Sequence, residues 1–351
     1  MKNKIILISL GFAALTLASC SGSNDGGNEL IPNQQSDKGP QQDEIDAKRN
    51  GSTEFVFEPI GGKDITKECD EKGTIEKVTY TTHAYALEAE DNVNNYVVEK
   101  QMNVYLPYGY SVENKYNVLI LAHGSGENED FWFAQGDYDP NNITTYLRGY
   151  GTTNVLDNMI KSGKAEKTIV VTPCLYTTYN GKDSPNSHFH YEVNNDILPY
   201  IVDHYSTFAE NSTSEGIIAA RDHFAYAGLS MGSGIGFRSI WTNSFEYISY
   251  IGNYSGGVGE EVYTEIANNL TTGKYKDYEC NYWFNGCGNI DGLATEHASA
   301  YLGLLSKAGN KFKVGYDVSQ YNADFVYIKG TGHSYACWLT CLYNSMLVFF
   351  K

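Results

Sequence analysis

The sequence predicts an α/β fold, a mostly parallel central sheet with helices on both faces. Short apolar runs recur along the chain, and each closes on Gly, Pro or Thr. Segments with helical spacing lie between these runs, and one run leads straight into a serine flanked by glycines, in "AYAGLSMGSG". With 351 residues, 42% of them hydrophobic, the chain is long enough to bury a large core.

The predicted strands begin with "QMNVYLPYGY", in which apolar residues alternate. Upstream of it, "TEFVFEPI" and "IEKVTYTTHAYAL" are predicted as extra strands at a sheet edge. The later runs are apolar throughout, as expected of parallel strands that are buried on both faces. These runs are "NVLILAHGSG", "KTIVVTP", "HFAYAG", "EYISYIGNYSG", "NYWFNGCG" and "ADFVYIKGTGH".

Two helices are predicted from apolar residues that recur at intervals of three or four. In "HYEVNNDILPYIVDHYS", every fourth residue from Val193 to Tyr205 is apolar or aromatic. In "EHASAYLGLLSKAG", Ala298, Leu302 and Leu305 line one face, and we expect Gly309 to be the C-terminal cap.

The first twenty residues form a targeting segment. Lys2 and Lys4 precede "IILISLGFAALTL", which is too short to cross a bilayer comfortably, and "LASC" ends at Cys20. This looks like a bacterial lipoprotein signal over residues 1–20, in which Cys20 is lipidated. The alternative is an ordinary secretory peptide that is cut nearby. Either way, we expect an exported protein. With the lipoprotein signal, the lipid on Cys20 would hold it at the cell envelope with its folded domain outside the cytoplasm.

Residues 21–52 are polar, acidic and rich in Gly, Asn and Gln, so they are predicted to be a disordered linker. Residues 53–351 show no internal repeat and no second linker, and are predicted to be one domain. The net charge of -17 argues against a nucleic-acid partner, since phosphate binding needs clustered Lys and Arg. We expect membrane contact only through the N-terminal lipid.

Export permits disulfides among the cysteines that follow the signal, but the sequence does not assign their pairing. Buried thiols that behave as small apolar side chains are the equal alternative. Their spacing does not fit a zinc site, and no phosphate-binding loop is present, so we expect neither metal nor cofactor. The cysteines are Cys69, Cys174, Cys280, Cys287, Cys337 and Cys341.

The pattern G-x-S-x-G after a buried strand and before a helix is typical of a nucleophile elbow. Gly228 and Gly232 would permit a strained turn that exposes Ser230 above the sheet. The alternative is a glycine-rich turn without chemistry. A serine hydroxyl needs a base, and the base needs an orienting carboxylate, in the chain order Ser, acid, His.

Two histidines follow the serine. His333 lies in a glycine-rich loop beyond the last predicted strand and is the expected base, whereas His297 falls in a predicted helix and is expected to be solvated. Asp291 follows another buried strand and is the favoured acid, although it could instead cap the next helix. Glu296, on that helix, and Asp324, at the wrong end of a strand, are weaker candidates.

The negative charge of a tetrahedral intermediate needs backbone N–H donors that are already in place. We expect them from Met231, directly after the serine, and from Ser125 in "LILAHGSGENEDFWF". His123 precedes the serine and is expected to be structural.

Aromatic side chains near these motifs are candidates for substrate binding, because rings can stack on sugars or wall a phenolic acid. The chain has 29 tyrosines and 15 phenylalanines, so the alternative that such rings belong to the core stays open. The candidates are Trp132, Phe133, Tyr176 and Trp338.

Five ordered motifs together resemble the esterase D-like branch of the α/β-hydrolases, specifically the secreted feruloyl and acetylxylan esterases of plant cell-wall degradation. They are "MNVYLPYGY", "LAHGSGENEDFWF", "GLSMGSG", "GCGNID" and "GTGHSYACW", and the resemblance covers residues 102–351. One departure is Ser233, where the family often has a second glycine; we expect a small polar residue to fit there.

The resemblance implies an α/β-hydrolase fold with Ser230 as nucleophile, His333 as base and Asp291 as its partner, and with the N–H groups of Met231 and Ser125 as the oxyanion hole. It implies a serine esterase that removes feruloyl or acetyl groups from plant cell-wall xylan through an acyl-enzyme. An S-formylglutathione hydrolase would share the motifs but works in the cytoplasm, against the export signal. Esterases for acetylxylan, siderophores or other small esters, a peptidase, and a non-catalytic glycan-binding lipoprotein on a hydrolase scaffold remain alternatives.

Overall fold

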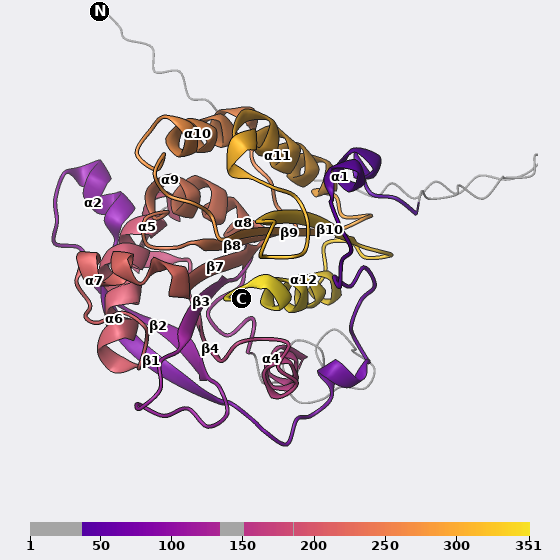
Figure 1. Ribbon diagram of the computed structural model, residues 1–351. Helices are drawn as coiled ribbons and strands as arrows, with labels where there is room; N and C mark the ends of the chain where they lie inside the picture. Colours follow the sequence, from indigo (N-terminus) through magenta and orange to yellow (C-terminus); the bar gives the residue numbers. More distant parts are fainter. Residues whose placement is uncertain (1–36, 134–150, 185) are drawn as a thin grey trace, which may run out of the picture. The chain divides into compact units, whose positions relative to one another are not determined.

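The computed structural model describes residues 37–133, 151–184 and 186–351. An eight-stranded sheet runs through this part of the chain in the order β1-β2-β4-β3-β7-β8-β9-β10 (Figure 1). Its strands are β1 Thr74–His83, β2 Val97–Leu106, β3 Asn117–Ala122, β4 Thr168–Pro173, β7 Phe224–Leu229, β8 Tyr250–Tyr254, β9 Tyr282–Gly288 and β10 Ala323–Ile328. A small hairpin consists of β5 Thr177–Tyr179 and β6 Lys182–Ser184.

The strands from β4 to β10 in this order pair in parallel, and every residue in them is buried. Burial on both faces explains why these segments are apolar throughout instead of alternating. The edge strands β1 and β2 run antiparallel, and β1 alternates between exposed and covered residues. The predicted α/β fold with a mostly parallel sheet is therefore confirmed.

Helices cover both faces of the sheet. Figure 1 shows α4 and α12 on one side and α10 and α11 on the other, and two separate apolar clusters fill these two interfaces. The longer helices are α4 Thr152–Lys161, α10 Glu260–Thr271, α11 Ala294–Lys307 and α12 Tyr335–Val348. The shorter ones are α1 Gln42–Lys48, α2 Tyr85–Asp91, α5 Phe189–Glu192, α6 Leu198–His204, α7 Ser214–Ala219, α8 Met231–Ile235 and α9 Trp241–Asn243, with short turns η1 Asp64–Thr66, η3 Asn186–His188, η4 Val193–Ile197, η5 Arg221–His223, η6 Gly236–Ile240 and η7 Gly309–Lys311.

The first predicted helix is present, but in three pieces: α5, the π-helical turn η4, and α6. Pro199 lies in the first turn of α6 and has no N–H to donate, which interrupts the regular hydrogen-bond ladder. The second predicted helix is α11, whose C-terminal cap is Ala308 rather than Gly309.

The chain is ordered earlier than the composition of residues 21–52 predicts. The segment from Asp37 onward contains α1, whose Ile45 is buried, and Arg49 donates to the carboxylate of Asp324 at 2.8 Å. The prediction of disorder is therefore wrong for residues 37–52, because single anchoring contacts are invisible in average composition. Residues 1–36, with the predicted signal and Cys20, lie outside the described residues.

The N-terminal strand predictions are half correct. "IEKVTYTTHAYAL" supplies β1 and then α2, but residues 53–60 form no strand. Instead, the backbone N–H and C=O of Val56 both bond to the side chain of Asn344 on α12. This segment is thus held by α12 and by one backbone bond, from the Lys329 N–H after β10 to the carbonyl of Phe57 at 2.7 Å, without forming a strand.

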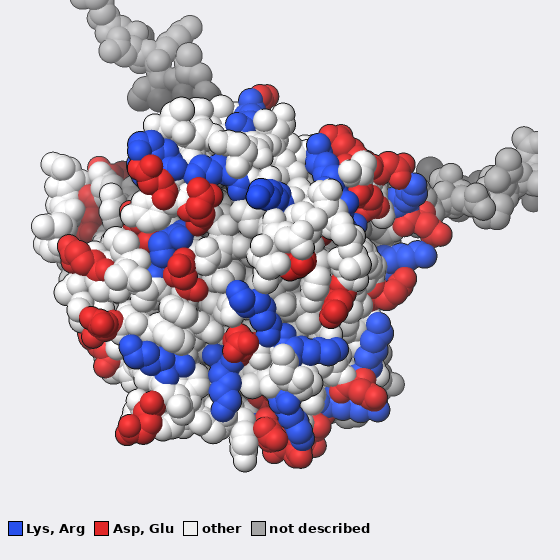
Figure 2. Space-filling model, viewed as in Figure 1, with Lys and Arg blue, Asp and Glu red and all other residues white. Residues whose placement is uncertain are grey.

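Charges of both signs are mixed on the surface. On the face drawn in Figure 2, Lys and Arg side chains lie among Asp and Glu. Pairs such as Lys77 with Asp130, at 2.9 Å, and Lys67 with Asp64, at 2.7 Å, bring opposite charges together. Exposed pairs of this kind contribute little to stability.

The buried pair between Arg49 and Asp324 makes a first prediction. The Asp324 carboxylate has no exposed area, so Arg49→Ala would leave a buried charge without its partner. We expect the free energy of unfolding at pH 7 to fall by about 3–5 kcal/mol, measured by urea denaturation. Lys48→Ala, at an exposed neighbouring site, is the control and should change it by less than about 0.5 kcal/mol. Equal losses in the two variants would contradict the assignment.

Candidate active site

Ser230 occupies the turn between β7 and α8. Its backbone has φ 52° and ψ -114°, a region that residues other than glycine rarely adopt. The Ser230 N–H donates to the carbonyl of Tyr254 at 2.9 Å, and its carbonyl accepts from the Gly234 N–H at 3.1 Å. Neighbouring strand and helix thus hold the strained conformation that a nucleophile elbow requires.

The flanking glycines are required by close backbone contacts. A Cβ on Gly228 would lie 2.6 Å from the carbonyl oxygen of Gly232, and one on Gly232 would lie 2.6 Å from that of His123. Ser233, by contrast, fits as expected: its hydroxyl is buried and donates to the carbonyl of Gly256 at 2.7 Å.

His333 connects Ser230 to Asp291. Its Nε2 lies 3.0 Å from the Ser230 Oγ, and its Nδ1 lies 3.0 Å from Oδ2 of Asp291. The three residues follow β7, β9 and β10, and the carboxyl ends of parallel strands lie at one edge of the sheet. The structure therefore brings together the three side chains that the sequence singled out.

Asp291 serves two contacts at once. Besides His333, its carboxylate accepts the backbone N–H of Leu293 at 2.8 Å. Leu293 is itself the N-cap residue of α11 and no side chain caps this helix, so the capping alternative is wrong. Burial by itself would raise the pKa of Asp291, but hydrogen bonds from His333 and the Leu293 N–H, with a smaller contribution from the nearby Ser255 hydroxyl, hold that pKa below its usual value. An ionised Asp291 keeps the His333 proton on Nδ1 and leaves Nε2 free to accept one.

Sequence analysis missed Ser255. It follows β8, is fully buried and has φ 48°. A non-glycine residue with positive φ carries no signal in the sequence, so only the backbone conformation identifies it.

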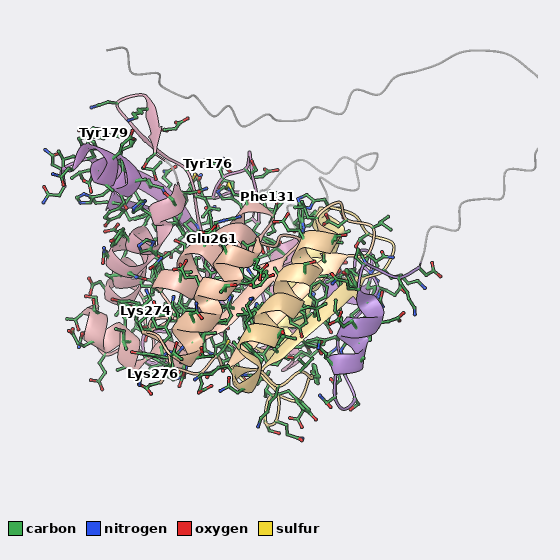
Figure 3. All side chains as sticks on the ribbon, turned by 90° about the horizontal axis from the view of Figure 1, so that it is seen from above. Phe131, Tyr176, Tyr179, Glu261, Lys274 and Lys276 are labelled. Carbon is green, nitrogen blue, oxygen red and sulfur yellow. The ribbon has the colours of Figure 1, made fainter. Side chains whose placement is uncertain are left out.

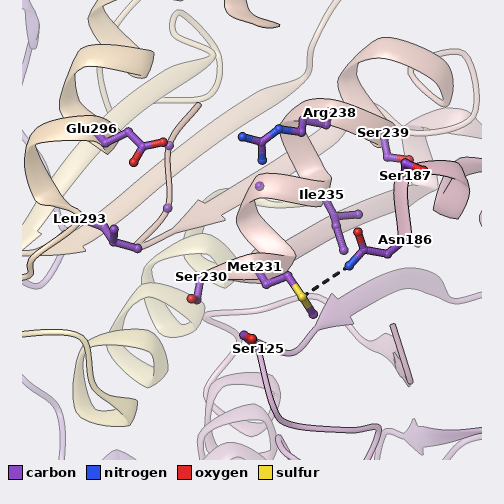
Figure 4. Close-up of a pocket in the computed structure, with 13 residues that line it drawn as sticks. Ser125, Asn186, Ser187, Ser230, Met231, Ile235, Arg238, Ser239, Leu293 and Glu296 are labelled. Atoms are coloured by element: carbon purple, nitrogen blue, oxygen red, sulfur yellow. Dashed lines mark hydrogen bonds between the residues drawn. The ribbon is translucent and has the colours of Figure 1, made fainter. Parts of the chain in front are cut away.

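His123 holds the loop that carries Ser125. Its Nε2 accepts the Leu175 N–H at 2.9 Å, and its Nδ1 donates to the carbonyl of Gly124 at 2.7 Å. Burial lowers the pKa of His123, which keeps the ring neutral and both bonds intact. This agrees with the structural role expected for His123. Ser125 and Met231 both line the cavity beside Ser230 (Figure 4).

A cavity of about 450 Å³ opens beside Ser230. Its walls come from α8 and η6, from η3, and from the loops that follow β8 and β9. Arg238 and Glu296 supply charged groups to it, and Met231, Ile235 and Leu293 supply apolar ones. Sequence analysis did not find Arg238 or Ile235, because no motif reports which residues of a helix face a cavity.

Most of the aromatic residues predicted to bind substrate belong to the core. Trp132 is fully buried and its Nε1 donates to the carbonyl of Ala122 at 3.2 Å, while Phe133 packs in the same apolar cluster. The prediction is wrong for both, because residues just after the oxyanion loop turn inward to cover the sheet. Trp338 is also buried, and its ring contacts the edge of His333 at 4.9 Å between centroids.

Tyr176 differs from these three residues. It is 41% exposed, next to the β5–β6 hairpin (Figure 3), and its hydroxyl accepts the Gly126 N–H at 2.8 Å. It also contacts the Met231 sulfur at 3.6 Å. Tyr176 therefore lies at the edge of the site.

His297 is not solvated, contrary to the expectation. It is fully buried, its Nε2 lies 3.1 Å from Oδ1 of Asn285, and burial lowers its pKa to about 3. The face of α11 that packs on the sheet carries it inward. The six described cysteines are all free thiols, and only Cys174 among them is not fully buried.

No protein-family model matches the chain. Among curated proteins, it is 28% identical over 318 residues to endo-1,4-beta-xylanase Y of Acetivibrio thermocellus, covering 88% of this chain and 26% of that protein. It is 29% identical over 264 residues to endo-1,4-beta-xylanase/feruloyl esterase of Xylanibacter ruminicola, covering 71% of this chain and 29% of that protein. The chain thus spans less than a third of the length of either relative.

Solved structures are similar to this chain as well, and these too are feruloyl esterases. The feruloyl esterase module from Clostridium thermocellum, a serine-to-alanine variant complexed with sinapinate, matches with a TM-score of 0.68 and 26% identity over 86% of this chain and 97% of that one. A ferulic acid esterase from Anaeromyces mucronatus matches in fold, with a TM-score of 0.59 and 20% identity over 82% of this chain and 96% of that one. The fold and site make this chain an α/β-hydrolase. The chain is similar to feruloyl esterases in sequence and in fold, which confirms the resemblance drawn from the motifs.

The contact between Asp291 and His333 makes a second prediction. An amide in Asp291→Asn cannot stabilise an imidazolium and favours the wrong tautomer of His333, so we expect kcat on 4-nitrophenyl acetate to fall by about 10⁴-fold. Asp317→Asn, at an exposed site, is the control and should retain full activity.

The comparison of wild type with Asp291→Asn also tests the lowered pKa of Asp291. A carboxyl whose pKa is lower in the folded state stabilises the protein fully above its unfolded value of about 3.9, and that contribution is lost as the pH falls through the folded value. The stability difference between wild type and Asp291→Asn should therefore shrink below about pH 4. A difference that stays constant down to pH 2 would contradict the assignment.

Proposed function

We propose that this protein is a serine esterase that removes feruloyl, or alternatively acetyl, groups from plant cell-wall xylan. The observation that carries the proposal is the continuous contact from Asp291 through His333 to Ser230, with 3.0 Å on each side of the imidazole. A general base in this position activates a serine hydroxyl, and its carboxylate partner orients the base.

In the proposed reaction, Oγ of Ser230 attacks the ester carbonyl while Nε2 of His333 takes its proton. The N–H groups of Met231 and Ser125 donate to the oxyanion of the tetrahedral intermediate. The intermediate collapses as the bond between the acyl carbon and the sugar oxygen breaks. His333 gives the proton to that oxygen, the sugar leaves with a free hydroxyl, and an acyl-enzyme remains. Water then attacks the acyl-enzyme with His333 again as base, releasing the acid and restoring Ser230.

The size of the cavity supports an aromatic acyl group. At about 450 Å³, it falls in the roughly 300–1,000 Å³ range of small-molecule sites and is far larger than an acetyl group requires. The names of the curated relatives include xylanase and feruloyl esterase, and one structural neighbour holds sinapinate, a substituted cinnamate. These likenesses support a plant cell-wall polysaccharide as the substrate.

The test is acid release from feruloylated and acetylated arabinoxylan by wild type and Ser230→Ala. We expect wild type to release ferulate and the variant to lose at least about 10⁴-fold of that rate, because the nucleophile is removed. Ser319→Ala, at an exposed site, is the matched control.

Four outcomes would redirect the proposal. Ferulate release by Ser230→Ala would refute the mechanism. Acetate release alone would identify an acetylxylan esterase. Labelling of Ser230 by a fluorophosphonate without release of either acid would leave a serine hydrolase for another ester, and glycan binding without labelling would favour a non-catalytic protein.

We also propose export and lipid attachment at Cys20, on the basis of Lys2, Lys4, the apolar run and "LASC". Among the residues that the structure describes, none of the helices has the length and apolar character needed to cross a membrane.

Metabolic labelling with palmitate in a bacterial host tests the lipid attachment. The wild-type chain should be labelled and sediment with membranes, and Cys20→Ala should lose both properties. Equal labelling of the two chains would refute lipidation at Cys20, and a shorter, unlabelled wild-type product would indicate ordinary signal cleavage.

A further inference from the structure

We propose that Arg238 selects the acyl group by donating hydrogen bonds to the ring oxygens of a hydroxycinnamoyl substrate. This inference rests on the proposed esterase function and deepens it, since it assigns the residue that distinguishes a feruloyl ester from one without ring oxygens.

Arg238 lies at the far end of the cavity from the oxyanion loop. Figure 4 shows its guanidinium and Ser125 at opposite ends, with Met231 and Ile235 between them. Ser230 and Arg238 belong to one continuous helical segment, which separates their Cα atoms by roughly 12 Å along its axis. An acyl group bound to Ser230 and directed along this wall would carry its ring past the apolar side chains toward the guanidinium.

Gly234 makes room for the guanidinium. A Cβ on Gly234 would lie 2.8 Å from Nη1 of Arg238, so the side chain lies directly against this glycine. Gly234 has no positive φ that would require a glycine, and a glycine inside a helix costs about 1 kcal/mol relative to alanine. The space that it leaves for Arg238 is a structural reason for a glycine here.

The donors of Arg238 are not used by the protein. Within the described ranges, its guanidinium has no carboxylate or carbonyl partner. Arg49 and Arg221 provide the contrast: Arg49 bonds to two carboxylates, and Arg221 bonds to the carbonyls of Glu279, Phe245 and Ile248. A guanidinium presents five donors in a planar fork, and a ligand in the cavity would be their acceptor.

Ring oxygens at the distal end of the acyl group fit this arrangement. The phenolic hydroxyl and methoxy oxygens of a feruloyl group are acceptors placed away from the ester carbonyl, and the ring between them is apolar like the cavity wall. An acetyl group is too short to reach Arg238, and an unsubstituted cinnamoyl group offers it no acceptor. Arg238 would therefore discriminate among acyl groups without taking part in the chemistry at Ser230.

The test is the ratio of kcat/KM for methyl ferulate to that for methyl cinnamate, in wild type and Arg238→Met. Methionine keeps an unbranched chain but has no donors. A hydrogen bond from a charged group is worth about 1.5–3 kcal/mol, so the ratio should fall about 10–100-fold, mainly through KM for ferulate. Lys313→Met, at an exposed site, should keep the wild-type ratio.

A second variant addresses the position of the side chain. Gly234→Ala leaves Arg238 in the sequence but displaces its guanidinium, so the ratio should fall in the same direction. Thermal unfolding of both variants checks that the fold is retained.

An unchanged ratio in folded Arg238→Met would overturn the inference, and this includes a variant that loses the same factor in kcat/KM on both esters. Wild type that hydrolyses 4-nitrophenyl acetate through Ser230 but shows no preference for ferulate would also overturn it, while leaving the esterase proposal intact. Activity that survives Ser230→Ala would defeat the proposed function itself.

Discussion

The strained turn at Ser230 is the constraint on which the rest of the site depends. A backbone at φ 52° persists only where its surroundings hold it, and here they do so from several sides. Strand β8 accepts the Ser230 N–H, and Gly232 lies close enough to the carbonyl of His123 to exclude any side chain. Because β3 and β7 are parallel neighbours, the oxyanion loop after β3 ends beside the turn after β7.

Burial and hydrogen bonding together decide the charges of the titratable groups buried near this turn. His123 and His297 lie in dry surroundings that lower their pKa values, and each is kept neutral. Asp291 is also buried, yet hydrogen bonds from His333 and the Leu293 N–H to its carboxylate favour the ionised form. Beside His333 there is thus an ionised Asp291, the arrangement in which His333 can gain and release a proton.

Aromatic residues near the sequence motifs do not, for the most part, contact the cavity. In a chain with 14% aromatic residues, most rings must fill the two interfaces between helices and sheet, as Trp132 and Phe133 do. The walls of the cavity instead come from residues without aromatic rings, on α8, η6, α11 and nearby loops. Proximity in sequence to the oxyanion loop does not predict which direction a side chain takes after the turn.

The sequence by itself determined the parallel strands, because burial on both faces requires continuous apolar runs. It also determined the elbow, because the backbone contacts around Ser230 leave room only for glycine at Gly228 and Gly232. The positions of Asp291 and His333 follow from the apolar runs, because each residue comes after the end of such a run. Only the tertiary structure decided that α1 and Arg49 join the domain, that His297 is buried, that Ser255 supports Asp291, and that Arg238 faces the cavity over Gly234. Each of these features depends on contacts between segments that are distant in sequence, or on which face of a helix packs against the sheet. Local residue patterns do not specify such contacts or such orientations.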